Sequence, residues 1–488
     1  MQTVKSNLFA IIGSSLFILF SLVAFYVENW FYFFTPFALL IIYISIYHTK
    51  YVFLFILFAT PLSINIEEFV TSVGLYVPTE PLLFGLLLLV IMYQLRTNFI
   101  PAFVFKNEIV WAIGIYLAWI FISACMSTHP LVSFKFLLVK LWYVVPLIGF
   151  GAHIFQNKRY IRSFLWLYSV SMCIVIVYTV IKHAGYGFAE KQSHWVMDPF
   201  FRDHTIYGAA VALIFPFLLG LFFSKKHDLF TQVILLVLLV INLTGLYFSY
   251  TRAAWLSIVA AGGVWLLIAF KVKFKYILFT VLSLVVVLAL SWTEIQFALA
   301  KNKSEHTTED FGKRLESAAN VTTDASNLER LNRWSCAMSM FEERPMFGFG
   351  PGTYAFEYAR FQKPENITII STNFGDGGNA HSEYLGPLSE MGVFGLLTTL
   401  LLIGTIFYKG ITLYNRWGEG DREMRVLLLG MLLSLVTYFV HGILNNYLDT
   451  DKACVPIFTI CACIVVMGGP SFRQAQGKLA SGTEGETK

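Results

Sequence analysis

The chain has 488 residues, of which 57% are hydrophobic and only 13% are charged, with a formal net charge of +5. A soluble protein is about 45–50% apolar and about 25% charged, so this chain has about half the charge that a water-facing surface requires. The composition excludes a soluble globular enzyme, a disordered chain and a disulfide-stapled secreted module. We therefore expect an integral membrane protein.

Long apolar runs predict an all-α fold with about 12–14 transmembrane helices, since one span needs roughly 20 mostly apolar residues. The first run lacks a small-x-small cleavage pattern, so we interpret it as a retained helix. Apart from Lys140 and Lys182, the runs carry almost no charge. The candidate ranges in chain order are 8–27, 30–47, 51–66, 79–95, 109–126, 136–155, 161–182, 205–223, 229–249, 253–270, 274–292, 384–408, 426–445 and 453–468.

The basic residues predict the orientation of these spans, because lysine and arginine concentrate in cytoplasmic loops. With both termini inside, alternate loops hold most of the bases and the short outside loops hold few. This distribution explains the bases as membrane anchors and argues against a nucleic-acid surface. The inside bases include Lys5, Lys50, Arg96, Lys106, Lys158, Arg159, Arg162, Lys225, Lys226, Lys271, Lys273, Lys275, Arg416, Arg422, Arg425, Arg473 and Lys478.

The spans divide the chain into five segments. We expect amino-terminal transmembrane helices over 1–228, transmembrane helices that carry an outside arginine over 229–292, a large outside loop over 293–383, carboxy-terminal transmembrane helices over 384–468 and a disordered inside tail over 469–488.

Within the outside loop, apolar residues recur at three- and four-residue spacing over 327–341, which predicts an amphipathic helix. Pro345 and the glycines Gly348, Gly350 and Gly352 follow it and predict a rigid turn.

Three groups of outside residues could carry chemistry. His381 precedes a predicted span and could exchange a proton near neutral pH, although a histidine there can also be an interfacial anchor. Gly392 and Gly395 follow it at a spacing suited to close helix packing. Arg252 lies in a short outside turn, where it could instead extend to the headgroups. Arg330, and Arg333 beside it, could simply occupy the polar face of the amphipathic helix.

Together these motifs resemble the O-antigen ligases and the related O-antigen polymerases and pilin-type O-oligosaccharyltransferases. His381-Ser382, nine residues and then Gly392-x-x-Gly395 is similar to the ligase signature. Arg252 resembles the arginine of the family's Ser-Arg-Gly-Ala-like turn, with Thr251 in place of serine.

The amphipathic helix extends the resemblance. Arg330, four residues before Trp334, resembles the family's Arg-x-x-x-Trp helix. The stretch from Pro345 through Gly350 to Tyr354 resembles the Pro-x-x-Gly-x-Gly-x-Gly-x-aromatic stretch that follows that helix. The resemblance covers roughly 230–400 and fits the superfamily better than any one of its members.

The resemblance implies a multi-pass enzyme of the bacterial inner membrane, with cytoplasmic termini and a periplasmic active site. Its donor would be a polyprenyl-pyrophosphate-linked glycan and its acceptor a hydroxyl, of which lipid A core is favoured over a growing glycan or a protein. A transporter or flippase of lipid-linked sugars is the competing class of protein.

The resemblance also implies roles for individual residues. Arg252 and Arg330 would bind the pyrophosphate, with Arg333 as a further candidate. His381 would take the acceptor's proton or hold the acceptor in line. Independently of the resemblance, Asp449 lies in another predicted outside turn and is a candidate acid to orient an arginine or His381. The scheme requires neither a metal nor a cofactor, and the residues from His194 to His204 lack metal-ligand spacing.

Overall fold

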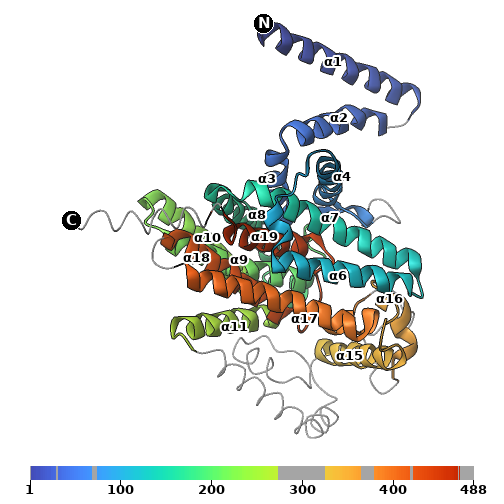
Figure 1. Cartoon of the computed structure of the whole chain (residues 1–488), viewed down its shortest axis with the longest axis vertical. Helices are drawn as coiled ribbons and strands as arrows, with labels where there is room; N and C mark the ends of the chain where they lie inside the picture. Colours follow the sequence, from blue (N-terminus) through green and yellow to red (C-terminus); the bar gives the residue numbers. More distant parts are fainter. Residues whose placement is uncertain are drawn as a thin grey trace, which may run out of the picture.

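The computed structural model describes residues 2–28, 31–68, 74–272, 325–363, 378–417, 421–470 and 472. Its elements form a bundle of long helices, from which α1 and α2 extend at the amino-terminal end (Figure 1). The helices are α1 (Gln2–Tyr26), α2 (Phe31–Tyr47), α3 (Thr49–Ala59), α4 (Thr79–Thr97), α5 (Ala102–Phe105), α6 (Glu108–Cys125), α7 (Pro130–Ile154), α8 (Lys158–Ala184), α9 (His204–Ser224), α10 (Leu229–Phe248), α11 (Arg252–Ala269), α15 (Ala325–Glu343), α16 (Tyr354–Glu357), α17 (Leu385–Arg416), α18 (Arg422–His441) and α19 (Asp451–Met467). Short 3-10 helices are η1 (Thr60–Leu62), η2 (Ile66–Glu68), η3 (Glu190–His194) and η4 (Tyr358–Phe361).

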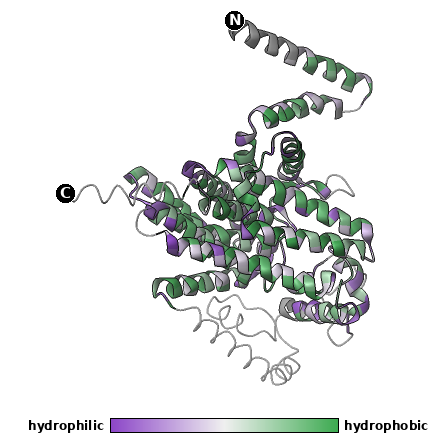
Figure 2. Ribbon diagram, in the orientation of Figure 1, coloured by the Kyte–Doolittle hydropathy of each residue, from purple (hydrophilic) through white to green (hydrophobic). Residues whose placement is uncertain are grey.

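The expected all-α integral membrane protein is confirmed. Within the described ranges, nine helices are long and apolar enough to cross a membrane. They are α4, α6, α7, α8, α9, α10, α11, α17 and α18. Hydrophobic residues predominate along the helices of the bundle, whereas α15 carries more hydrophilic ones (Figure 2).

The remaining predicted spans take other forms. The runs 30–47 and 51–66 form one pair of helices bent by 114°, so they are not two separate straight spans. The run 453–468 corresponds to α19, which has 17 residues and is buried along its whole length, as expected of a helix that is hydrophobic all round. The run 8–27 lies in α1. The run 274–292, residues 293–324 of the outside loop and most of the tail lie outside the described residues.

The only strands in the described part of the chain lie between α3 and α4. β1 (Ile64–Asn65) pairs antiparallel with β2 (Tyr76–Val77), and Ile64 lies opposite Val77. This two-residue ladder closes the connection at the end of the bundle where α4 begins.

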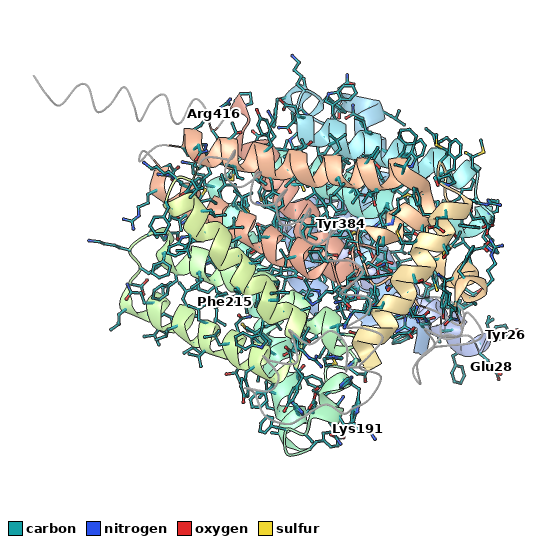
Figure 3. The ribbon with its side chains drawn as sticks, turned by 90° about the horizontal axis from the view of Figure 1, so that it is seen from below. Tyr26, Glu28, Lys191, Phe215, Tyr384 and Arg416 are labelled. Carbon is teal, nitrogen blue, oxygen red and sulfur yellow. The ribbon has the colours of Figure 1, made fainter. Side chains whose placement is uncertain are left out.

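The two ends of the bundle hold different sets of charged residues. One end, which we call the basic end, holds ion pairs between the α7–α8 and α17–α18 connections: Lys158 pairs with Asp421, and Arg162 lies 3.2 Å from Glu423. The other end, which we call the site end, is where α9, α11, α17 and α19 begin. Tyr384 and Arg416 mark the site end and the basic end of α17 in Figure 3.

Several charged side chains are buried in the bundle, including Lys140, one of the two exceptions in the apolar runs. Lys140 lies in the middle of α7, is 2% exposed and donates a hydrogen bond to the carbonyl of Leu448. Glu80, in the first turn of α4, accepts hydrogen bonds from the Tyr143 hydroxyl and from the backbone nitrogen of Tyr76, the latter at 2.9 Å. Each group has a partner, as buried charge requires.

A second buried ionic group ties α19 to the end of α3. Lys452 Nζ donates to the carbonyls of Thr60 and Ser63 at 2.7 and 2.8 Å. The Ser63 hydroxyl donates to Asp451 at 2.5 Å. The lysine thereby meets carbonyl oxygens at a helix carboxy-terminus, where a cation is stabilised. This contact fixes the start of α19 and the loop that precedes it.

Candidate active site at the end of the bundle

The predicted amphipathic helix is confirmed as α15, which extends over Ala325–Glu343. Its buried face differs in detail from the expected one. Met338, one of the apolar residues at the three- and four-residue spacing, is 41% exposed, whereas Cys336 and Met340 are fully buried. These two residues form a small separate core with Phe349 and Tyr354 from the following turn. α15 and the glycine turn therefore fold as one unit beside the bundle.

Arg333 contacts the segment of the chain that precedes His381. Its guanidinium is buried, pairs with Glu329 at 2.8 Å and donates to the carbonyl of Asn379 at 3.3 Å. It also lies 4.8 Å from the ring centre of Tyr358. A Cβ at Gly378 would come within 2.0 Å of the guanidinium, so only glycine lets the chain pass this close.

Arg330 connects α15 to the loop between α18 and α19. Its Nε donates to the carbonyl of Leu444 at 3.2 Å. A second link joins the same loop to the chain before His381, since the Asn379 amide donates to the carbonyl of Asn446 at 3.4 Å. Three segments far apart in the sequence thus meet at one point of the site end.

His381 adopts a left-handed backbone conformation with φ of 47°. Its backbone nitrogen donates to the Asn379 side chain at 3.0 Å, and its carbonyl accepts from Trp334 Nε1 at 3.3 Å. Burial, reinforced by the positive charges of Arg333 and Arg330, lowers the pKa of His381 to about 4. The imidazole is therefore neutral at pH 7 and available as a hydrogen-bond acceptor.

Arg252 is the first residue of α11, and a hydrogen bond joins the turn before it to the start of α9. The Thr251 hydroxyl donates to the carbonyl of His204 at 2.8 Å and does not cap α11. A Cβ at Gly208 would lie 2.6 Å from Thr251 Cβ, so the glycine permits this close approach. The charges of Arg252 and Arg330 both reach His204, which places both arginines at the same site.

A cation at a helix amino-terminus is electrostatically unfavourable, because this end carries partial positive charge. Arg252 occupies such a position at the start of α11. Together with Arg330 and the helix end, it forms a concentration of positive charge that suits an anion.

Two acids near His381 were not among the candidates chosen from the sequence. The carboxylates whose charges act on His381 belong to Asp203 and Glu329. Asp203 also caps α9, accepting from the backbone nitrogens of Thr205 and Ile206 at 2.7 and 3.1 Å. The charge of Asp449 acts on Lys140, and its role as orienting acid stays a prediction.

Glu383 is a residue of the site to which the sequence motifs assign no role. Its Oε1 accepts from the Tyr438 hydroxyl at 2.5 Å and from the backbone nitrogens of Tyr447 and Leu448 at 2.6 and 2.8 Å. Burial raises the pKa of its carboxyl. Glu383 thus fastens the loop after α18 to the chain that carries His381. A carboxylate two residues from a candidate histidine was the available signal.

Asp449 and Asp451 also form an Asp-x-Asp pair that the sequence reasoning overlooked. The structure turns Asp451 toward Ser63 and Lys452. Among the described residues, no three histidine, cysteine or acidic side chains gather in a metal-binding arrangement.

Gly392 does not serve the helix packing expected from its spacing. Its φ is 67° and it breaks α17. A Cβ there would lie 2.3 Å from the carbonyl oxygen of Met346, and the nitrogen of Val393 donates to the carbonyl of Pro345 at 2.8 Å. Gly395 lies in the turn after the break, where a Cβ would meet the Pro387 carbonyl at 2.5 Å.

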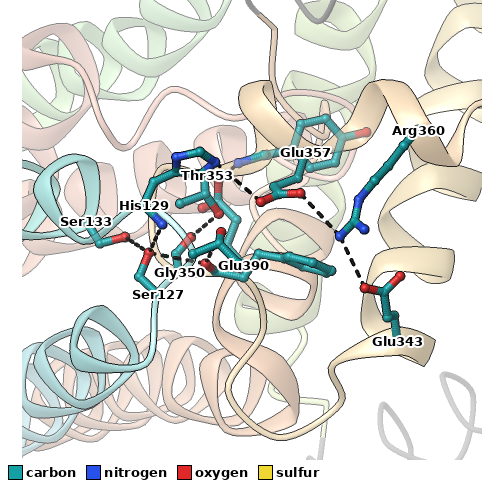
Figure 4. A network of polar contacts seen from close by, with 12 residues as sticks. Ser127, His129, Ser133, Glu343, Gly350, Thr353, Glu357, Arg360 and Glu390 are labelled. Carbon is teal, nitrogen blue, oxygen red and sulfur yellow. Dashed lines mark hydrogen bonds and ion pairs between the residues drawn. The ribbon is translucent and has the colours of Figure 1, made fainter.

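The glycine turn, residues 345–354, packs against the break in α17. Gly350, with φ of 117°, donates its backbone nitrogen to the carbonyl of Glu390 at 2.7 Å. The Glu390 carboxylate accepts from the backbone nitrogens of Gly352 and Tyr354 at 3.1 and 2.9 Å. Figure 4 shows Glu390 among these contacts, with Ser127 and Ser133 beside Gly350. The Pro-x-x-Gly and His-Ser motifs therefore form one interlocked structure.

Comparison with known proteins identifies one family. Residues 235–400 match the family described as O-antigen ligase. The matched segment contains Arg252, Arg330 and His381, as well as the interlocked glycines. No curated protein matches the chain. The chain thus carries the domain of a membrane glycosyltransferase-like family over about a third of its length.

Proposed function

We propose that this chain, with its O-antigen ligase domain, transfers a glycan from a polyprenyl pyrophosphate to an acceptor hydroxyl on the periplasmic side. Ligation to lipid A core is the reaction that we favour. The family match supports glycan transfer in general. The convergence of Arg252, Arg330 and His381 at one end of the bundle supports this particular chemistry.

The two arginines suit the leaving group. When the bond between sugar and pyrophosphate breaks, negative charge increases on the pyrophosphate oxygens. Guanidinium groups remain charged at any working pH and bind phosphate through paired donors. Arg252 and Arg330, together with the positive end of α11, would stabilise that charge as it develops.

His381 suits the acceptor. Its neutral imidazole can accept a hydrogen bond from an attacking hydroxyl, which orients the oxygen and can take its proton. Arg333 acts differently from the other arginines in this proposal, because its contacts with Glu329 and Asn379 already hold it in place. We assign Arg333 a positioning role for the chain that precedes His381.

The observation that carries the proposal is a pair of hydrogen bonds to the loop after α18, one from α15 and one from the segment before His381. Arg330 binds the Leu444 carbonyl and Asn379 binds the Asn446 carbonyl, so the pyrophosphate arginine and the histidine segment meet on one short loop. Donor and acceptor groups held this close would react as a positioned pair.

Transfer by the purified full-length protein in lipid nanodiscs tests the proposal. The assay supplies a polyprenyl-pyrophosphate glycan with one of three acceptors: lipid A core, a second polyprenyl-linked glycan or a pilin-type peptide. We expect transfer to lipid A core, and loss of at least about a hundredfold in rate for Arg330→Lys and His381→Ala.

The matched control is Arg360→Lys, because Arg360 is half-exposed and pairs with Glu343 and Glu357 outside the site. It should retain the wild-type rate. Transfer to either of the other acceptors would replace ligation by polymerisation or protein glycosylation. Full activity in both site variants, or movement of the lipid-linked sugar across the bilayer without transfer, would refute the mechanism.

A further inference from the structure

Four polar residues beside the site have buried atoms without hydrogen-bond partners in the described part of the chain. The atoms are both ring nitrogens of His441, both amide atoms of Asn445, Oδ1 of Asn446 and Nδ1 of His204. His441 and Asn445 are each only 1% exposed. Buried polar atoms in native proteins nearly always have partners, so a concentration of unpartnered ones indicates a place where another molecule supplies them.

These residues adjoin the groups assigned to the pyrophosphate and to the acceptor. His441 ends α18, and the nitrogen of Leu444 donates to its carbonyl at 3.0 Å. The carbonyl of Leu444 in turn accepts from Arg330 at 3.2 Å. The charge of Arg330 acts on both His441 and His204. The unpartnered group therefore lies directly beside the pyrophosphate arginine.

The chemistry of the group differs from that of the arginines. Imidazole and carboxamide side chains offer both donors and acceptors without a formal charge. Sugar hydroxyls require this mixture, because each one donates one hydrogen bond and accepts others. The sugar of the donor is joined directly to the pyrophosphate, so the residues that bind it must adjoin those that bind the phosphates.

We propose that His204, His441, Asn445 and Asn446 form a carbohydrate subsite for the sugar attached to the donor's pyrophosphate. The subsite deepens the proposed function and rests on it. His441 and Asn445 hydrogen-bond the sugar hydroxyls, and the partners that these side chains lack in the protein alone are supplied by the donor.

The test compares two lipids that differ only by the sugar. Full-length protein in nanodiscs is titrated with a polyprenyl pyrophosphate and with the same lipid carrying one N-acetylhexosamine. We expect His441→Leu and Asn445→Leu each to weaken binding of the sugar-bearing lipid about tenfold, the effect of losing a hydrogen bond. Binding of the bare lipid should change less than about twofold.

Thermal unfolding separates a binding role from a structural one. Replacing an unpartnered buried polar group by an apolar one of similar size should not lower the melting temperature, whereas a structural role predicts a lower one. The control is Thr459→Val, since the Thr459 hydroxyl is also buried and unpartnered but lies within α19. It should leave the binding of both lipids unchanged.

Each remaining result has a definite meaning. If wild-type protein binds neither lipid, the proposed function fails and the subsite fails with it. If wild-type protein binds both lipids but the subsite variants weaken the binding of both equally or of neither, the subsite is refuted and the proposed function stands. Variants that melt well below wild type would likewise refute it in favour of a structural role.

Discussion

His381 illustrates how neighbouring residues determine the chemistry of one side chain. Asn379 and Trp334 hold its backbone in a left-handed conformation that few residues other than glycine adopt. Arg333 and Arg330 disfavour its protonated form. The sequence alone indicated a histidine that titrates near neutral pH, because spacing reveals neither burial nor the distance to the arginines.

The low pKa of His381 predicts an unusual pH dependence. Protonation would remove the acceptor lone pair, so kcat/KM for the acceptor should stay constant from pH 7.5 down to about pH 5 and fall as the pH drops through the pKa of about 4. A pH–rate profile of the reconstituted enzyme checks this. An acid limb near the ordinary value of about 6.5 would contradict it.

Arg333 should control the position of that acid limb. Arg333→Gln removes a positive charge beside the imidazole, which favours its protonated form and raises the pKa of His381, so the limb should move to higher pH. Arg333→Lys retains the charge and serves as the control, with the limb near its original position. A limb that stays in place in Arg333→Gln would show that the charge of Arg333 does not contribute to the low pKa of His381.

At the scale of elements, α15 was the most predictable part of the site, because its apolar spacing specified a helix with one buried face. The break in α17 was not predictable. The spacing of Gly392 and Gly395 fits both close helix packing and a kink, and only the carbonyls of Pro345 and Met346 decide between them. The burial of Lys140 was not predictable either, because a single lysine hardly changes the hydropathy of a long apolar run.

Gly392→Ala should destabilise the protein. Its φ of 67° is strained for alanine, and the added Cβ would lie 2.3 Å from the Met346 carbonyl oxygen. We expect a loss of about 1–3 kcal/mol, seen as a lower melting temperature in detergent, together with reduced transfer.

Gly404→Ala is the matched control on the same helix, because a Cβ at Gly404 would meet nothing within 4 Å. Alanine favours the helix by up to about 1 kcal/mol, so this variant should melt no lower than wild type. Equal melting of both variants would show that the break in α17 tolerates a side chain.

For the whole molecule, the composition and the long apolar runs were enough to predict an all-α protein that lies in a lipid bilayer. The positions of the two ends support the orientation inferred from the basic loops, because Lys158 and Arg162 gather at the end opposite Arg252 and His381. The sequence could not reveal that these segments meet. No motif marks Leu444 or Asn446, yet their backbone carbonyls join the helix that carries Arg330 to the segment that carries His381.

Cysteine labelling in spheroplasts tests the orientation. Lys191 and Lys225 are both exposed but lie in connections at opposite ends of the bundle. In a background with the exposed Cys125 replaced by serine, Lys191→Cys should react with an impermeant maleimide from outside, and Lys225→Cys only after lysis. The reverse pattern would place the site in the cytoplasm.

The interlock between the glycine turn and the broken helix has a consequence for engineering. Gly350 and Gly352 bind Glu390, while Pro345 binds Val393 across the break. A chimaera that takes its outside loop from a relative with a different acceptor must therefore take 345–354 and 381–395 from the same parent. The two segments form a single exchangeable unit, although residues 355–380 separate them along the chain.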